Sequence, residues 1–76
     1  KGDAVTSFDD QVKALTKSDV LTIQNQYDAA MDTDHGSGEH WTLIATLNQK
    51  GFAVRTVEAA IETAENIITL WYSLNR

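Results

Sequence analysis

Cysteine and proline are absent from the 76 residues of this chain, and glycine occurs only four times. A domain of this size buries only about 60% of the surface that its unfolded chain exposes, so small domains usually add disulfides, a metal or a partner. Because there is no cysteine, disulfides are excluded. A metal or a partner is therefore the expected source of additional stability.

Basic residues are also few: six Lys and Arg stand against eleven Asp and Glu, which gives a formal net charge of −5. The basic residues are scattered, whereas nucleic-acid phosphates require clustered Lys and Arg, so nucleic-acid binding is excluded. No hydrophobic run approaches the ~18 residues of a membrane span. The sequence begins Lys1-Gly2-Asp3 without an initiator methionine, which either cleavage of a longer precursor or trimming would explain.

Hydrophobic residues in the first half of the chain recur with the period of an α-helix. Ser7 followed by Asp10 resembles a capping box, and the apolar spacing behind it predicts a helix over 8–15. The phase then breaks, and Ser18 is expected to cap a second helix over 18–31. A short strand within this second segment is the alternative, because three of its residues also alternate.

Past a loop over 32–40, the hydrophobic period changes from 3.6 to two. Apolar residues on one side of the alternation predict a strand; they are Trp41, Leu43, Ala45 and Leu47. The next four residues have the composition of a turn, in which Gly51 can adopt a positive φ, and the alternation then resumes. These features predict a hairpin over 41–55. After Thr56 the helical period returns and predicts a C-terminal helix over 57–74.

Together these elements predict an α+β fold, a small α/β sandwich whose helices pack on an antiparallel sheet. A two-stranded sheet is only marginally stable, and its two exposed edges can accept another chain. We therefore expect strands of a partner chain to complete the sheet, and the isolated chain to fold poorly or aggregate. The sequence forms one small domain or half-domain, with helical segments over 8–31, loop 32–40, hairpin 41–55 and helix 57–74.

The segment DTDHGSGEHW, residues 32–41, concentrates three carboxylates and two histidines. The oxygen ligands and glycine of an EF-hand loop are not found at the required positions, and no phosphate-binding glycine motif is present. A zinc site formed by His35, Glu39 and His40 lacks the HExxH spacing. We interpret the segment as a polar connection and predict no metal and no cofactor. A small metal-binding regulator that uses Asp34, His35 and His40 is a third functional alternative.

Five residues are candidate pH-sensing groups. His35 and His40 lie among carboxylates, which favour protonated imidazole. Glu58, Glu62 and Glu65 follow one another at helical spacing, and such like-charge pairs cost a few tenths of a kcal/mol each. A raised pKa at such groups would make the folded state most stable in acid. The alternative is a solvated surface with no sensing role.

The predicted last helix carries more apolar surface than a small domain can cover. Its Ile67, Trp71, Tyr72 and Leu74, together with Phe52 of the hairpin, are candidates for a surface that meets a partner chain or a membrane. Burial in the core of this chain is the alternative.

No group of residues points to catalysis. The serines and histidines lie outside any nucleophile-elbow or triad-like context, so we predict that the chain is not an enzyme. Its size and acidity are similar to those of acyl carrier proteins. However, the modifiable serine of the Asp-Ser-Leu motif is missing, because the order here is Ser18-Asp19-Val20.

The run NQKGFAVR at 48–55, followed by a helix that ends in LWYSLN at 70–75, resembles the hairpin-then-helix half of small secreted fungal killer toxins. Toxins of this family, made by smut fungi and by a salt-tolerant yeast, are cut from precursors into two short chains and fold as α/β sandwiches. The smut toxins are rich in disulfides. This chain without cysteine is therefore more similar to one chain, the beta chain, of the salt-mediated yeast toxin.

The resemblance implies a subunit of a secreted toxin that kills competing, sensitive yeast cells by perturbing their plasma membrane. It further implies a noncovalent heterodimer with a second short chain from the same precursor, stable in acid and favoured by salt. The alternative is a small acidic intracellular adaptor without catalytic activity, which docks its helical face on a protein partner. A signal peptide and basic cleavage sites in the precursor would favour the toxin.

Overall fold

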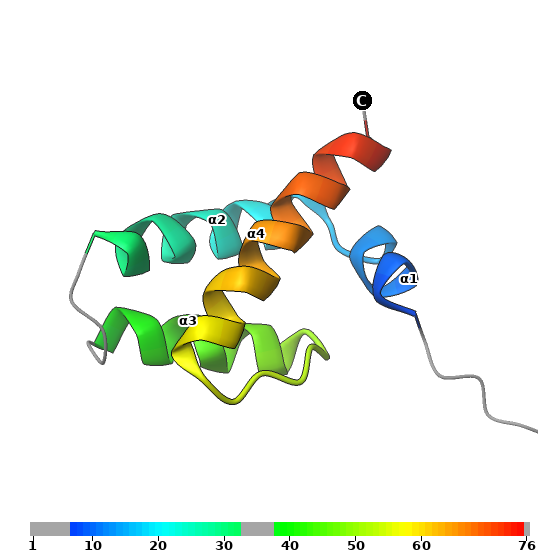
Figure 1. Ribbon diagram of the computed structural model, residues 1–76. Coiled ribbons are helices and arrows are strands. Elements are labelled where there is room, and N and C mark those ends of the chain that lie inside the picture. Colours follow the sequence, from blue (N-terminus) through cyan, green and yellow to red (C-terminus); the bar gives the residue numbers. More distant parts are fainter. Residues whose placement is uncertain (1–6, 33–37, 76) are drawn as a thin grey trace, which may run out of the picture.

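Four α-helices and no β-strand make up the residues that the computed structural model describes, 7–32 and 38–75. The helices are α1 (Phe8–Lys13), α2 (Lys17–Met31), α3 (Gly38–Gln49) and α4 (Val57–Leu74). Helices α2 and α3 lie side by side and antiparallel, α4 crosses both, and α1 packs against α4 (Figure 1). The predicted α+β class and its α/β sandwich are therefore wrong, because the described chain is a small helical bundle.

Helix α2 begins with a reciprocal cap at Thr16 rather than at the expected Ser18. The Thr16 hydroxyl accepts a hydrogen bond from the Asp19 N–H, and the Asp19 carboxylate accepts one from the Thr16 N–H, each at 3.1 Å. A capping box needs a side chain at the third helical position that can return the bond. Asp19 provides it for Thr16, whereas the residue three positions after Ser18 is Leu21, which cannot.

The strand predicted from residue 41 is instead helix α3. Its buried side chains are His40, Leu43, Ile44 and Leu47, a set with the period of a helix. The strand prediction placed Trp41 on the same face as Leu43 and placed Ile44 on the opposite one. In the structure Trp41 is exposed, and Leu43 and Ile44 are both buried. The local alternation did not decide the structure, because packing against the rest of the molecule overrides a weak strand propensity.

The second half of the predicted hairpin, residues 52–55, is an extended connection that pairs with no strand in the described chain. The Asn48 side chain takes the place of a neighbouring strand. Its Nδ2 donates to the Val54 carbonyl at 2.9 Å, and its Oδ1 accepts from the Val54 N–H at 3.1 Å. Gly51, with φ of 97°, turns the chain out of α3. Both backbone groups of Val54 are thus satisfied without a sheet.

The hydrophobic core lies where α4 crosses α2 and α3. Its largest fully buried apolar side chains come from all three helices and from α1; they are Ile23, Leu43, Leu47, Ile67, Val12 and Val20. Because the described residues contain no sheet, the argument that unpaired strand edges require a partner chain does not apply. A noncovalent partner and a poorly folded isolated chain stay predictions without that support.

Candidate functional site

Three of the five residues considered for a partner or membrane surface lie in this chain's own core. Phe52, Ile67 and Trp71 are 4%, 0% and 9% exposed. The indole N–H of Trp71 donates to the Leu15 carbonyl at 3.1 Å, which ties the end of α4 to the segment after α1. These three side chains therefore hold the fold together and leave little surface for another molecule.

The other two residues, Tyr72 and Leu74, are exposed at the C-terminal end of α4, at 41% and 42%. The Tyr72 hydroxyl donates to Gln24 Oε1 at 3.2 Å, so the ring is fixed against α2. Among the described residues, no helix combines the length and the hydrophobicity that crossing a membrane requires.

The acidic row of the last helix lies on the solvent-exposed face of α4, where Glu58, Glu62 and Glu65 are all exposed. Glu65 Oε2 accepts a hydrogen bond from the Tyr27 hydroxyl at 2.9 Å. This bond, with partial burial and the nearby negative charge, raises the pKa of Tyr27 above its ordinary value of 10.0. One member of the row therefore joins α4 to α2.

The structure describes one of the two histidines. His40 is 1% exposed on the inner face of α3, while His35, with Asp34, lies outside the described residues. Across residues 7–32 and 38–75, no three side chains of His, Cys, Asp or Glu are grouped so that they could hold a metal ion.

An ion pair connects the start of α2 to the end of α3. Lys50 Nζ lies 2.6 Å from Asp19 Oδ1, and both side chains are partly exposed. The hydrogen bonds that Asp19 accepts from Lys50 and from the backbone of Thr16 hold the pKa of its carboxyl below the ordinary 3.8. The pair therefore favours the ionised carboxylate in the folded state.

We expect Asp19→Asn to lower the melting temperature at neutral pH and to lose this effect in strong acid. Because the folded pKa of Asp19 is lowered, its stabilising contribution is present above pH 3.8 and disappears as the pH falls through the folded value. Thermal melts from about pH 7 to about pH 2 would measure it, with the exposed Asp28→Asn on the same helix as control. A difference in melting temperature that persists unchanged in acid would contradict this assignment. Because the contribution of Asp19 is lost in acid, it works against the acid stability that the toxin resemblance implies.

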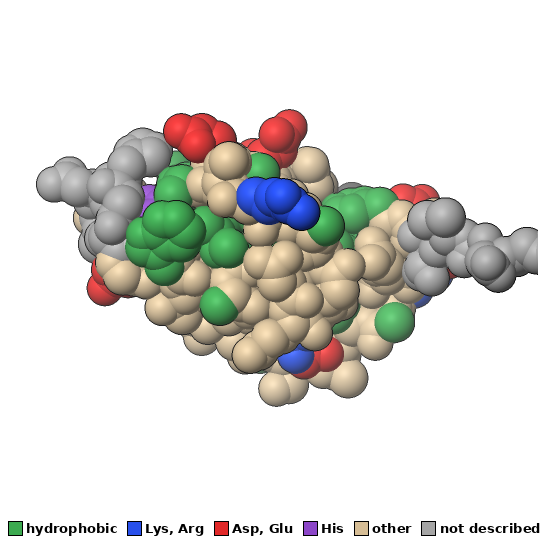
Figure 2. Space-filling model, turned by 90° about the horizontal axis from the view of Figure 1, so that it is seen from below, with side chains coloured by type: hydrophobic (Ala, Val, Ile, Leu, Met, Phe, Trp, Pro, Cys, Tyr) green, Lys and Arg blue, Asp and Glu red, His purple; other side chains and the backbone are tan. Residues whose placement is uncertain are grey.

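Trp41 is the most exposed large hydrophobic side chain among the described residues, at 56%. It lies on the outer side of α3, and Ala45, one turn further on, is also exposed. Figure 2 shows hydrophobic side chains gathered at the end of the molecule where α3 begins, with a basic side chain nearer the middle. A tryptophan exposed on a well-packed helix has the character of an interface anchor.

Arg55 is exposed in the connection that follows α3. The exposed Asn48 continues the line of Trp41 and Ala45, and its carboxamide binds Val54 directly before Arg55. These hydrogen bonds fix the backbone next to Arg55. We call Trp41, Ala45 and Arg55 the α3 outer surface.

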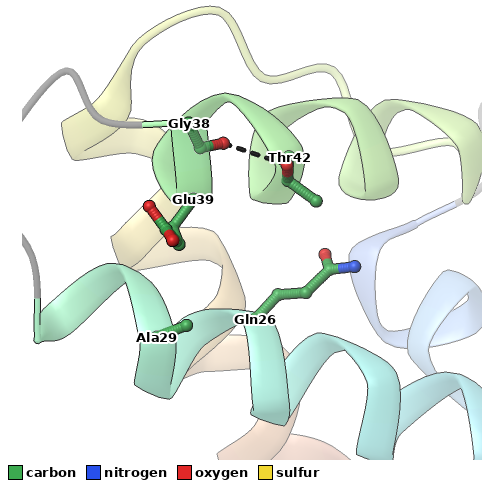
Figure 3. A pocket seen from close by; sticks show the side chains of 5 residues that line it. All are labelled: Gln26, Ala29, Gly38, Glu39 and Thr42. Carbon is green, nitrogen blue, oxygen red and sulfur yellow. Dashed lines mark hydrogen bonds between the residues drawn. The ribbon is translucent and has the colours of Figure 1, made fainter.

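A cavity of about 200 Å³ lies between α2 and α3. It is lined by Gln26 and Ala29 of α2 and by Gly38, Glu39 and Thr42 of α3, while the ribbon of α4 runs behind the two helices (Figure 3). Two of the five lining residues have little or no side chain, which leaves the space open. We call this space the α2/α3 cavity.

Three of the residues that line the α2/α3 cavity have polar side chains, namely Gln26, Glu39 and Thr42. The Thr42 hydroxyl donates to the Gly38 carbonyl at 2.9 Å, so its oxygen has only lone pairs left for other groups. Gln26 Oε1 is buried and has no hydrogen-bond partner among the described residues. An acceptor buried in this way costs about 1–3 kcal/mol. Glu39 adds a carboxylate, and no Lys or Arg is among the described lining residues.

Sequence reasoning missed both features for different reasons. Trp41 was assigned to the same side of a strand as Leu43, whereas a helical period counted from His40 places it outside. Gln26 and Thr42 carry no motif, and they meet only because α2 and α3 pair in antiparallel fashion. Glu39 was considered only as a zinc ligand, a role for which the described residues form no group.

No protein-family model, curated protein or solved structure matches this chain. Its function therefore has to be argued from the α3 outer surface and the α2/α3 cavity. Both include residues of α3, the helix for which the sequence pattern predicted a strand.

Proposed function

We propose that this chain is a small, non-enzymatic protein-binding module that docks a partner on the α3 outer surface. The observation that carries the proposal is the 56% exposure of Trp41 on a helix whose opposite face is fully packed. Tryptophan and arginine are the residue types most enriched in binding hot spots, and both occur on this surface. The core fixes α3 before a partner arrives, so binding orders little additional chain.

The charge of the chain favours a basic partner. With a formal net charge of −5, the chain attracts positively charged proteins over a distance of about a Debye length, roughly 8 Å at physiological salt. Arg55 would then orient the complex by meeting a carboxylate of the partner. Long-range charge thus speeds the encounter, and Trp41 provides most of the contact energy.

The killer-toxin hypothesis stays a prediction, and its structural argument is weaker than the sequence indicated. The run NQKGFAVR, which supported the resemblance, spans the end of α3, a turn and an extended connection instead of a hairpin. A second short chain from the same precursor is one partner that could bind the α3 outer surface. Basic cleavage sites in the precursor would support that source for the partner.

We expect Trp41→Ala to weaken partner binding by about 30-fold or more, because a hot-spot aromatic contributes at least 2 kcal/mol. Ligands for the immobilised chain would be selected from a displayed peptide library, and their affinities measured by calorimetry. Tyr72→Ala, which removes a second exposed aromatic on α4, is the matched control and should change affinity by less than about threefold. Selected ligands that bind Trp41→Ala as tightly as the original chain would overturn the proposal.

A further inference from the structure

Helix α1 is held in place by a small part of the molecule. Of the three other helices that the structure describes, α1 packs on α4, and it lies to one side of the antiparallel pair α2 and α3 (Figure 1). It has only six residues, whereas isolated helices shorter than about 12–15 residues are marginal in water. Helix α1 therefore depends for its structure on the surface against which it packs.

That surface is formed by the turn after α3 and by the end of α4. The Gln11 side chain donates from Nε2 to the Gly51 carbonyl at 2.9 Å. The rings of Phe8 and Phe52 meet edge to face, with 5.7 Å between their centroids. The indole of Trp71 completes the surface by its hydrogen bond to the segment that follows α1. We call Gly51, Phe52 and Trp71 the α1 docking face.

The docked segment has the spacing of a helix that binds to another molecule. Its contacts with the rest of the chain come from positions i, i+3, i+4 and i+7, which are Phe8, Gln11, Val12 and Leu15. Amphipathic helices that bind as separate molecules use the same spacing of anchors. The charged residues between the anchors, Asp9, Asp10 and Lys13, are exposed. Helix α1 thus has the pattern of a ligand that the chain itself carries.

Residues 14–16 connect α1 to α2, and their composition allows them to become helical. Ala14 is already helical, with φ of −76° and ψ of −12°, whereas Thr16 is extended, with ψ of 167°. Neither glycine nor proline occurs between Gly2 and Gly36. A change of backbone angles within 14–16 would therefore join the two helices into one continuous helix over 8–31.

Hydrogen bonds at the bend keep α1 and α2 separate. Thr16 and Asp19 cap α2 reciprocally, and Trp71 donates to the Leu15 carbonyl. A continuous helix loses these bonds and gains backbone hydrogen bonds through the former bend. Helix α1 would then extend along the axis of α2, with about 12 Å of helix between Phe8 and Thr16. In that form it leaves its own docking face, and Phe52 and Trp71 lose their cover.

We propose that residues 14–16 are a hinge through which two copies of this chain exchange α1. Each α1 docking face then binds the α1 of the other copy, which supplies the same anchors at the same spacing. A second copy is the occupant because its α1 is the segment that the structure shows in place on this face. The exchange lies away from the start of α3 (Figure 1) and goes beyond partner docking on the α3 outer surface.

The concentration at which exchange occurs follows from the short tether of α1. Such a tether gives α1 an effective concentration of about millimolar at its own docking face. The original chain should therefore be monomeric in dilute solution and form dimers in concentrated solution. Sedimentation equilibrium at rising protein concentration would give the dissociation constant of the dimer.

Substitutions at the hinge should change that constant in opposite directions. Thr16→Ala should strengthen the dimer by about 30-fold, because the cap that it removes stabilises only the bent form and both copies lose it. Lys17→Pro should abolish the dimer. Lys17 is exposed at the first position of α2, where proline is accepted, whereas proline inside a continuous helix breaks it. Lys17→Ala removes the same charge without this block and is the matched control.

A substitution within α1 distinguishes exchange from an ordinary dimer. Gln11→Ala removes a hydrogen bond that the monomer and the exchanged dimer both contain, so the dissociation constant should change by less than about twofold. Mixing isotope-labelled and unlabelled Thr16→Ala chains provides the direct test by NMR. We expect nuclear Overhauser effects between the Phe8 ring of one copy and the Phe52 ring of the other.

Three results would overturn the exchange of α1. One is a Thr16→Ala chain that stays monomeric at about millimolar concentration, and another is a Lys17→Pro chain that dimerises as the original does. The third is a dimer without Phe8 to Phe52 effects between copies, which would have formed through a different surface. Trp41→Ala should leave the dimer unchanged, so this proposal and the docking of a partner on the α3 outer surface can fail separately.

Discussion

Replacing Trp71 with alanine will lower the free energy of unfolding by roughly 3–5 kcal/mol, whereas the same change at Trp41 will cost less than about 1 kcal/mol. Trp71 is 9% exposed and donates a hydrogen bond to the Leu15 carbonyl, while Trp41 is 56% exposed. Both substitutions remove the same atoms, so their difference measures the environment of the two rings. Chemical denaturation of the isolated chain, followed by circular dichroism, would give both values.

Trp71→Phe is an intermediate step at this site. It keeps one aromatic ring but removes the pyrrole half of the indole with its N–H, so the Leu15 carbonyl loses its bond, and the cost should be at least about 1–2 kcal/mol and below that of Trp71→Ala. If Trp71 served a partner chain instead of this core, Trp71→Ala would leave the isolated chain as stable as Trp41→Ala does. That result would contradict the packing of α4 described above.

Substituting alanine for Leu43 or for Ile44 will destabilise the chain by about 2–5 kcal/mol in each case. The two neighbours are both buried in α3, at 0% and 7% exposure. In the strand that the sequence pattern predicted, they would point to opposite sides of the sheet, and only Leu43 would share the face of Trp41. Urea denaturation of the two variants therefore distinguishes a helix from a strand at this segment.

Thr42→Ala is the control for this pair because Thr42 precedes Leu43 directly and is exposed. It loses one hydrogen bond to the Gly38 carbonyl and should cost no more than about 1 kcal/mol. An Ile44→Ala variant as stable as Thr42→Ala would argue for outward-facing Ile44 and against the helix.

The outer side of α3 carries the proposed function, and its inner face carries stability. Leu43, Ile44 and Leu47 anchor the helix in the core. Trp41 lies on one flank, and Glu39 lines the cavity on another. Because substitutions on the flanks leave the core intact, binding and folding can be measured independently in this chain.

The sequence by itself determined the elements whose local signals agree. The helix predicted over 57–74 is observed as Val57–Leu74, because a hydrophobic stripe repeated over five turns fits only the helical period. The sequence also predicted the turn at Gly51, because glycine adopts the positive φ that this turn requires at little cost. Charge and composition argued against nucleic acid as a partner, a prediction made without reference to the fold.

Only the tertiary structure decided the conformation of residues 41–47 and everything built on it. The seven residues Trp-Thr-Leu-Ile-Ala-Thr-Leu alternate in the manner of a strand. In the structure they pack as part of helix α3. The choice was made by burial of Leu43 and Ile44 together in the core. The exposed Trp41 and the meeting of Gln26 with Thr42 follow from that choice. Local propensities differ by about 1 kcal/mol or less, whereas each buried aliphatic side chain contributes about 1.5–3 kcal/mol, so packing determined the structure.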